Sequence, residues 1–303
     1  RPIPLYVGSG SPLSNVGTLT NQGIELEVGY KLSVDKVNLS FLANASYVKN
    51  EIKNLGNQTG YIDKESLPTL GTVSRNENGY PIGYFFGYKA IGVFQTQEEI
   101  DSYISPATGK PIQPNAAPGD TKFEDLNGDG VISDDNEDRT MIGKPNPDWM
   151  VGLTVAADWN GFDLSAFFQG SFGADVFDAL RRYELAAVNY TSDALERWTG
   201  PGTSNSMPRI VLGDTPKNFR PSTLLVHDAS FLRLRNLQVG YTLPAQLTRK
   251  AYIQRLRFYA SFDNLLTITG YKGMDPEIGS TMGIDKGVYP QARVYTFGLN
   301  LTF

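Results

Sequence analysis

The last thirteen residues, Gln291 to Phe303, alternate between two kinds of side chain. The first set is mostly aromatic or aliphatic, and the second is small or polar. The first set is Gln291, Arg293, Tyr295, Phe297, Leu299, Leu301 and Phe303; the second is Ala292, Val294, Thr296, Gly298, Asn300 and Thr302. Because successive side chains of a strand point to opposite faces, the pattern predicts a β-strand with one apolar face. A transmembrane barrel needs such strands, since one face meets lipid and the other meets a watery lumen.

Six further segments alternate in the same way. Most are close to the ~9–11 residues that a tilted membrane strand requires. They are Gly23 to Leu32, Val37 to Tyr47, Trp149 to Trp159, Phe162 to Gly170, Phe231 to Leu243 and Leu256 to Phe262. The sequence therefore predicts an all-β fold of antiparallel transmembrane strands.

The connections between these segments alternate strictly in length. The short ones are Ser33 to Lys36, Trp159 to Gly161 and Pro244 to Gln254; the long ones are Val48 to Asp148, Ser171 to Ser230 and Thr267 to Pro290. Bacterial barrels have short periplasmic turns and long external loops. The alternation thus predicts that the last strand runs toward the periplasm and that the long connections are external. A soluble, calcium-stabilised, carbohydrate-binding β-sandwich is the alternative, although a sandwich has no reason to sort its loops in this way.

Composition excludes several other classes of protein. No run of about 18 apolar residues occurs, which excludes a helical membrane protein. The absence of cysteine and the single histidine, His227, leave little scope for thiol chemistry or a histidine-based metal centre. A net charge of −5 without a basic cluster argues against a nucleic-acid partner. A mean hydropathy of −0.28 is compatible with a barrel, whose strands are apolar on one face only.

The long connections are expected to contain structure of their own. A hundred-residue loop without structure, from Val48 to Asp148, would be improbable. Within it, Gly79 to Phe94 is rich in aromatic and β-branched residues, which predicts extended structure outside the membrane or, alternatively, an eighth membrane strand. Asp175 to Val188 and Ser192 to Trp198 are predicted to be external helices.

An acidic segment, Asp125 to Asp138, resembles a calcium loop in its first half. Its oxygen-bearing side chains are spaced by two and precede a glycine, as in loops that wrap a hard cation. The predicted ligands are Asp125, Asn127, Asp129 and the backbone carbonyl of Val131. The twelfth position is Asn136 rather than glutamate, which leaves Glu137 or Asp138 to close the loop. We therefore predict a structural Ca²⁺ site, with a solvated acidic turn as the alternative.

Several ordered segments resemble one known family. They are NQGIELEVGY (21–30), PIGYFFGYKAIGVFQTQEEI (81–100), FEDLNGDGVI (123–132), IGKPNPDWMVGL (142–153), FFQGSFGADV (167–176) and SFLRLRNLQVGYTLP (230–244). From about Asn21 to Phe303 the chain resembles the carboxy-terminal part of a SusC-type (SusC/RagA-like) TonB-dependent transporter of the Bacteroidetes outer membrane. The resemblance favours Asp138 as the residue that closes the calcium loop.

The resemblance implies a larger assembly than this chain. Such transporters are similar to barrels of about 22 strands with a plug in the lumen. We expect residues 1–22 to form an external loop, residues 23–303 to supply the last strands, and the plug and TonB-contacting segment to precede Arg1. The implied partners are TonB, a SusD-like lipoprotein lid, outer-membrane lipid and an oligosaccharide or peptide substrate.

Candidate substrate contacts are charged or aromatic residues on the expected lumenal face or at the mouth. They are Arg233, Arg235, Arg257, Tyr259 and Asp263. Pairing among themselves or with a plug is the alternative role. A secreted hydrolase using Asp134, Asp135, Glu137 or Asp138 is a weak alternative, because these acids share one loop rather than facing one another across a cleft. No enzymatic activity is predicted.

Overall fold

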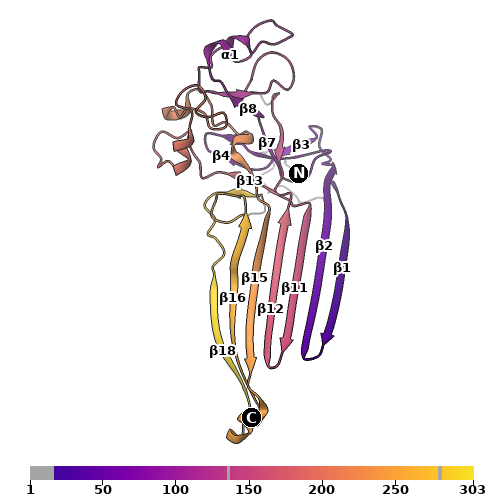
Figure 1. The fold of residues 1–303 in the computed structure, drawn as a ribbon. Coiled ribbons are helices and arrows are strands. Elements are labelled where there is room, and N and C mark those ends of the chain that lie inside the picture. Colours follow the sequence, from indigo (N-terminus) through magenta and orange to yellow (C-terminus); the bar gives the residue numbers. More distant parts are fainter. Residues whose placement is uncertain (1–16, 135–136, 279–281) are drawn as a thin grey trace, which may run out of the picture.

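One antiparallel sheet dominates the computed structural model, which describes residues 17–134, 137–278 and 282–303 (Figure 1). Its strand order in the described chain is β1-β2-β11-β12-β15-β16-β18. The strands are β1 (Thr18–Val34), β2 (Val37–Asn54), β11 (Trp149–Trp159), β12 (Phe162–Phe172), β15 (Phe231–Thr242), β16 (Arg255–Thr269) and β18 (Val294–Thr302). Each predicted strand is confirmed, and each pairs with its neighbour in this series.

The first two strands are longer than predicted. Thr18 to Gln22 was expected to be loop but belongs to β1, and β2 continues to Asn54. Here the pairing is polar: the side chain of Asn50 donates to that of Asn21 at 2.6 Å. A strand that extends beyond the apolar band needs no apolar face, so the alternation that predicts strands is absent there. The remainder of the expected external loop, residues 1–16, lies outside the described residues.

The register places the apolar sets of all these strands on one face. One row crosses the whole sheet: Tyr30, Phe41, Val155, Ala166, Leu237, Phe262 and Tyr295. Large side chains on this face are exposed, such as Ile24 at 74% and Phe297 at 76%. In a β-sandwich this face would be buried against a second sheet. The sandwich interpretation is therefore wrong, and the sheet has the exposed apolar face that lipid requires.

Aromatic clusters mark both ends of the apolar face. Tyr47 and Trp149 pack at 5.0 Å near one end, and Phe162 packs against Trp159 and Tyr241 near the other. Trp149 and Trp159 are the first and last residues of β11, which corresponds to roughly 34 Å along the strand at ~3.4 Å per residue. With a typical tilt of about 40°, the band is about 26 Å high, close to the ~25 Å apolar band of outer-membrane barrels.

The ends of the sheet differ as the loop lengths predict. Residues 35–36 and 160–161 form tight turns, and Asp35, Asn160 and Gly161 have the positive φ angles that such hairpins require. Residues 243–254 contain α2 (Ala245–Thr248) and η5 (Arg249–Ala251). The long connections, residues 55–148, 173–230 and 270–293, all leave the opposite end, which we call the external end (Figure 1).

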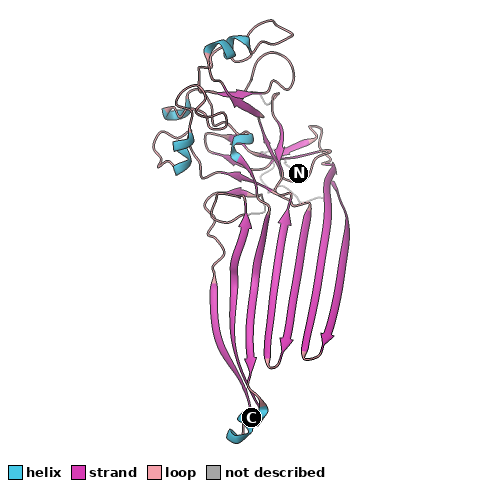
Figure 2. Ribbon diagram, viewed as in Figure 1, coloured by secondary structure: helices cyan, strands magenta, loops and turns pink. Residues whose placement is uncertain are grey.

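Short strands and a few short helices form these connections (Figure 2). The first contains β3 (Tyr61–Asp63), β4 (Ser66–Leu67), β5 (Gly71–Thr72), β6 (Ser74–Glu77), β7 (Tyr84–Gly87), β8 (Ala90–Val93), α1 (Gln97–Ser102), β9 (Thr121–Phe123) and β10 (Thr140–Gly143). The second contains β13 (Asp175–Asp178), η2 (Ser192–Glu196), η3 (Leu212–Asp214), η4 (Thr223–Leu225) and β14 (Val226–Asp228), and the third contains β17 (Ile284–Asp285). No helix among the described residues is long and apolar enough to cross a membrane.

The structure of these connections differs in part from the sequence predictions. Within Gly79 to Phe94 the predicted extended structure is confined to β7, which pairs with β6 and β10, and β8, which pairs with β9; residues 79–83 are not strand. Both strands are external, and the alternative of an eighth membrane strand is wrong. The helix predicted over Asp175 to Val188 is also wrong. Its first residues form the strand β13, which lies between β14 and β17. Val176 and Phe177 are adjacent in sequence and both fully buried, which suits a strand covered on both faces. Ser192 to Trp198 contains only the short 3₁₀ helix η2.

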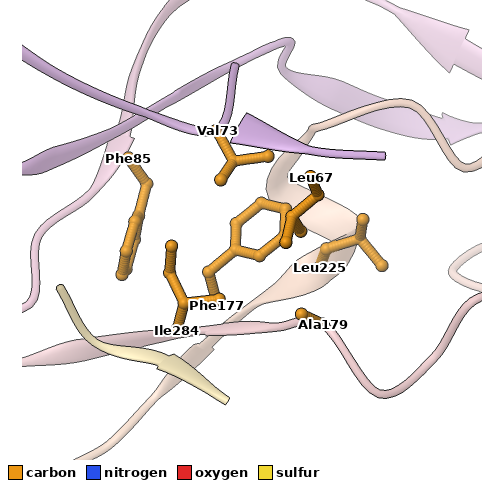
Figure 3. Close-up of a cluster of buried hydrophobic side chains, with 7 residues drawn as sticks. All are labelled: Leu67, Val73, Phe85, Phe177, Ala179, Leu225 and Ile284. Atoms are coloured by element: carbon orange, nitrogen blue, oxygen red, sulfur yellow. The ribbon is translucent and has the colours of Figure 1, made fainter. Parts of the chain in front are cut away.

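All three long connections contribute to one hydrophobic core (Figure 3). Leu67, Val73 and Phe85 come from the first, Phe177, Ala179 and Leu225 from the second, and Ile284 from the third. The pairing of β13 with β14 and β17 joins the second connection to the third. The connections are therefore one folded unit, which we call the external body, rather than separate loops.

Candidate functional site

A β-bulge places two arginines on the polar face of the sheet near the external end. Arg235 is an extra residue relative to β12, where the register shifts between Phe167 and Phe168. The paired strand β16 is irregular at the same level, where Asn264 has a φ of 53°. A bulge reverses the alternation of faces. Arg233 and Arg235 thus lie on the polar face, although simple alternation would group them with Leu237.

These arginines hold the third connection against the sheet. Arg233 is only 2% exposed and donates to Asp275 at 2.5 Å, to Glu277 at 3.1 Å and to Thr267 at 2.9 Å. Arg235 donates to both carboxylate oxygens of Glu277 at 2.6 Å. Two guanidinium groups and two carboxylates balance in charge, as buried ions require. We call Arg233, Arg235, Asp275 and Glu277 the arginine clamp.

Asp275 also joins the two ends of the third connection. Its carboxylate accepts the backbone N–H groups of Glu277 and Gln291, both at 2.9 Å. Burial alone would raise the pKa of Asp275, but these hydrogen bonds and Arg233 outweigh it and hold the pKa below its ordinary value. Asp275 therefore stays ionised in neutral solution.

The remaining predicted substrate residues also contact other residues of the sheet. Arg257 makes a two-point ion pair with Asp163, with one N–O distance of 2.9 Å. Asp263 accepts a hydrogen bond from Asn236 at 2.7 Å. The ring of Tyr259 lies over Gly298, where an added Cβ would approach it to 2.5 Å.

The five predicted residues do not form one site. Thr267, the partner of Arg233, lies ten residues beyond Arg257 on β16, or roughly 34 Å along the strand at ~3.4 Å per residue. Arg233 and Arg235 are at the external end, whereas Arg257 and Tyr259 are near the turns. All five lie on the polar face, and their contact with substrate stays a prediction.

The acidic segment folds into a compact loop in the external body. Asp125 accepts the N–H groups of Gly128 at 2.8 Å and Gly130 at 2.9 Å, and Asp129 accepts that of Val131 at 2.8 Å. Gly130 has a φ of 88°, which only glycine adopts readily. Asx-type turns thus wind the loop as the calcium-loop pattern predicts.

In the second half of this loop Asp138 turns its side chain inward. Asp138 is fully buried and accepts the N–H groups of Leu126 at 3.1 Å and Ser133 at 3.0 Å. The Asn127 amide donates to Asp129 and Glu137, both at 3.0 Å, so an N–H group links two carboxylates. In the described residues no three histidine or acidic side chains are grouped as a metal site. Asn136 and Asp135 lie outside those residues, and Ca²⁺ binding stays a prediction.

His227 makes local contacts within the external body. It lies in β14, where its Nε2 atom is 3.4 Å from the Arg181 guanidinium and 3.7 Å from Asp178. Burial, reinforced by Arg181, lowers the pKa of His227, which favours the neutral ring at physiological pH. Its Nε2 atom thus shares a local hydrogen bond with Arg181.

Two adjoining cavities lie where the polar face meets the external body. Their volumes are about 580 Å³ and 310 Å³, and Asn146, Pro147 and Met150 line both. The larger reaches Asn21 and Asn50 at the ends of β1 and β2, and the smaller reaches Gln169 on β12. Sequence reasoning missed these residues because they come from distant segments and match no motif.

Together these features define a class of protein. The sheet has an apolar face of membrane height, a polar face with balanced charges, tight turns at one end and a folded body at the other. This is the wall of an outer-membrane β-barrel with external loops.

Comparison with known proteins identifies the family. No family model matches the chain. The chain is 32% identical over its whole length to TonB-dependent receptor P3 of Formosa agariphila, and 30% identical over 95% of its length to TonB-dependent receptor SusC of Bacteroides thetaiotaomicron. It covers only 30% and 27% of those proteins. The RagAB peptide importer in its open-open state superposes with a TM-score of 0.74 at 28% identity, over all of this chain and 31% of that one.

The chain belongs to the SusC-type TonB-dependent receptors and corresponds to the carboxy-terminal part of their barrel. The resemblance stated from the sequence motifs is thereby confirmed, as is the fold class.

Proposed function

We propose that the protein containing this chain imports oligosaccharides or peptides across the outer membrane, driven through TonB. The observation that carries the proposal is the apolar row that crosses every strand of the wall, with a polar face behind it. Such a wall encloses an aqueous path through lipid. Over the whole of this chain, the sequence is similar to a protein named TonB-dependent receptor P3. This similarity favours TonB as the source of energy, because the outer membrane has no ATP.

A SusD-like lipoprotein is the proposed partner at the external end. Large apolar side chains project from the external body: Leu195, Leu212 and Tyr289 are all strongly exposed. Apolar and aromatic side chains of this kind are enriched where proteins meet. TonB is the proposed partner at the periplasmic side, through segments outside this chain.

Uptake by cells tests the proposal. Cells that express the full-length protein should accumulate a labelled oligosaccharide or peptide mixture, and a protonophore should abolish accumulation. Deletion of the transporter is the matched control. Accumulation that survives the protonophore would show that import is not driven through TonB, and extraction of the protein without detergent would contradict its location in the membrane.

We also propose that Ca²⁺ is a structural ion of the acidic loop, held by Asp125, Asn127, Asp129, Val131 and Asp138. Support comes from the oxygen-rich side chains and from the turns that wind them inward. Chelation of Ca²⁺ should lower the melting temperature of the full-length protein. The effect should vanish in Asp129→Asn but persist in Asp101→Asn, a substitution on α1. An identical melting temperature with and without chelator would refute the assignment.

A further inference from the structure

The adjoining cavities at the external end form one groove that crosses several strands. Asn21 lies on β1, Asn50 on β2, Met150 on β11 and Gln169 on β12, and these strands are consecutive in the sheet. Ile82 and Asn146 of the external body form the opposite side. We call these six residues the polar-face groove.

The length of the groove suits a short extended chain. Three inter-strand steps of ~4.8 Å separate β1 from β12, which gives roughly 14 Å. An extended peptide rises by ~3.3 Å per residue, so the groove accommodates about four or five residues. The groove runs across the strands, and a bound chain would cross them beneath the external body.

Amide groups in the groove have hydrogen-bonding capacity to spare. Asn21 accepts from Asn50, Asn146 donates to the Ile82 carbonyl, and Gln169 accepts from Arg235. Within the described chain, the Nδ2 group of Asn21, the Oδ1 atom of Asn146 and the Nε2 group of Gln169 make no hydrogen bond. Donors and acceptors that alternate in this way match a backbone that carries both N–H and C=O groups.

The surrounding side chains favour an uncharged peptide chain over a sugar. Lys144 is paired with Asp148, and Glu277 with Arg233 and Arg235, so these charges are compensated. Asp175, in the smaller cavity, accepts the backbone N–H group of Lys144 at 3.0 Å. Met150 and Ile82 offer exposed apolar surface. The aromatic rings in the lining are not free for stacking: Tyr47 packs on Trp149, and Phe231 is buried beside Arg233.

We propose that the polar-face groove binds an extended, uncharged stretch of peptide chain. The inference rests on the proposed import function and names the substrate class and the site of first contact with the wall. Met150 lies at the centre, where both cavities meet, and the amides of Asn21, Asn146 and Gln169 bind the backbone on either side.

Binding to the purified full-length transporter in detergent tests the groove without any energy source. The probe is a casein digest enriched in peptides of about five to eight residues, somewhat longer than the groove. Captured peptide is quantified by mass spectrometry, with maltohexaose as the competing sugar probe. Met150→Trp should lower peptide capture about tenfold or more, a loss of ~1.4 kcal/mol. The matched control is Leu153→Trp, on the same strand but on the apolar face, and it should leave capture unchanged.

Asn146→Ala, which only removes atoms, should reduce capture in the same direction without crowding the fold. Equal capture by Met150→Trp and Leu153→Trp would overturn the groove, as would capture of maltohexaose in place of peptide. Protonophore-sensitive uptake of peptide that persists in Met150→Trp cells would refute the groove and leave the import function intact. Absence of protonophore-sensitive uptake in wild-type cells would instead refute the proposed function.

Discussion

Removal of one buried ring should loosen all three external connections together. Phe177 is 0% exposed, and its ring lies 5.9 Å from that of Phe85, in a core that also includes Leu67 and Ile284. Phe177→Ala leaves a cavity in the core of the external body. The connections cannot move freely to close this cavity, because the strands of the sheet fix where each connection begins and ends. Substitutions of this kind cost about 3–5 kcal/mol. The cost falls on the external body, whose core is separate from the apolar face of the wall.

Hydrogen exchange measured by mass spectrometry on the full-length protein reads this effect segment by segment. A loss of 3–5 kcal/mol corresponds to roughly a hundredfold to a few thousandfold faster exchange where opening is local. Exchange should accelerate in residues 173–179 and also in residues 67–86 and 282–286. Leu195→Ala is the control, since Leu195 belongs to the second connection but is 80% exposed. Faster exchange confined to residues near Phe177 would refute the single external body.

Three other perturbations follow from the contacts. Arg235→Met should release the third connection to proteolysis, since Glu277 loses its hydrogen bonds to this guanidinium, worth about 1.5–3 kcal/mol; unchanged protection would refute the clamp. Burial raises the pKa of Asp214 to about 6, so the folded state holds its proton more tightly than the unfolded state, and stability should fall as pH rises from about 4 to about 6. Asp214→Asn should remove this dependence of the melting temperature on pH, and an unchanged dependence would contradict the raised pKa of Asp214. Gly298→Val should impair heat-modifiable folding by crowding the Tyr259 ring, and Tyr259→Ala should relieve the defect; a folded Gly298→Val protein would refute that contact.

The wall could be predicted from the sequence because its physics is local. Lipid on one face and water on the other impose a period of two on each strand, and the row from Tyr30 to Tyr295 shows how closely the chain obeys it. The alternation of short and long connections then gives the direction of each strand. The bulge at Arg235 interrupts the period of two, because one extra residue moves Arg233 to the other face of the sheet. No feature of the sequence indicates this extra residue.

The external body could not be predicted in the same way. Asp175 to Val188 has the spacing of a helix, yet Val176 and Phe177 are buried on both sides by strands that arrive from residues far away in the chain. Tertiary pairing decides such segments. The polar-face groove escaped prediction for the same reason, because only the order of the strands brings Asn21 and Gln169 to the same groove. The calcium-loop pattern did predict the local turns, since Asp125 and Gly130 act within a few residues of each other.

One face of the sheet meets lipid and the other faces an aqueous lumen, and spin labels on alternate residues of one strand test this arrangement most directly. This chain contains no cysteine, so single cysteines placed in β11 of the full-length protein can carry a spin label with little background from this region. In outer-membrane vesicles, a label at Leu153 should collide more often with apolar oxygen, and a label at the adjacent Thr154 more often with a water-soluble nickel complex. The preference should alternate at each step from Val151 to Ala157. Equal access of the nickel complex to both faces would contradict the membrane wall.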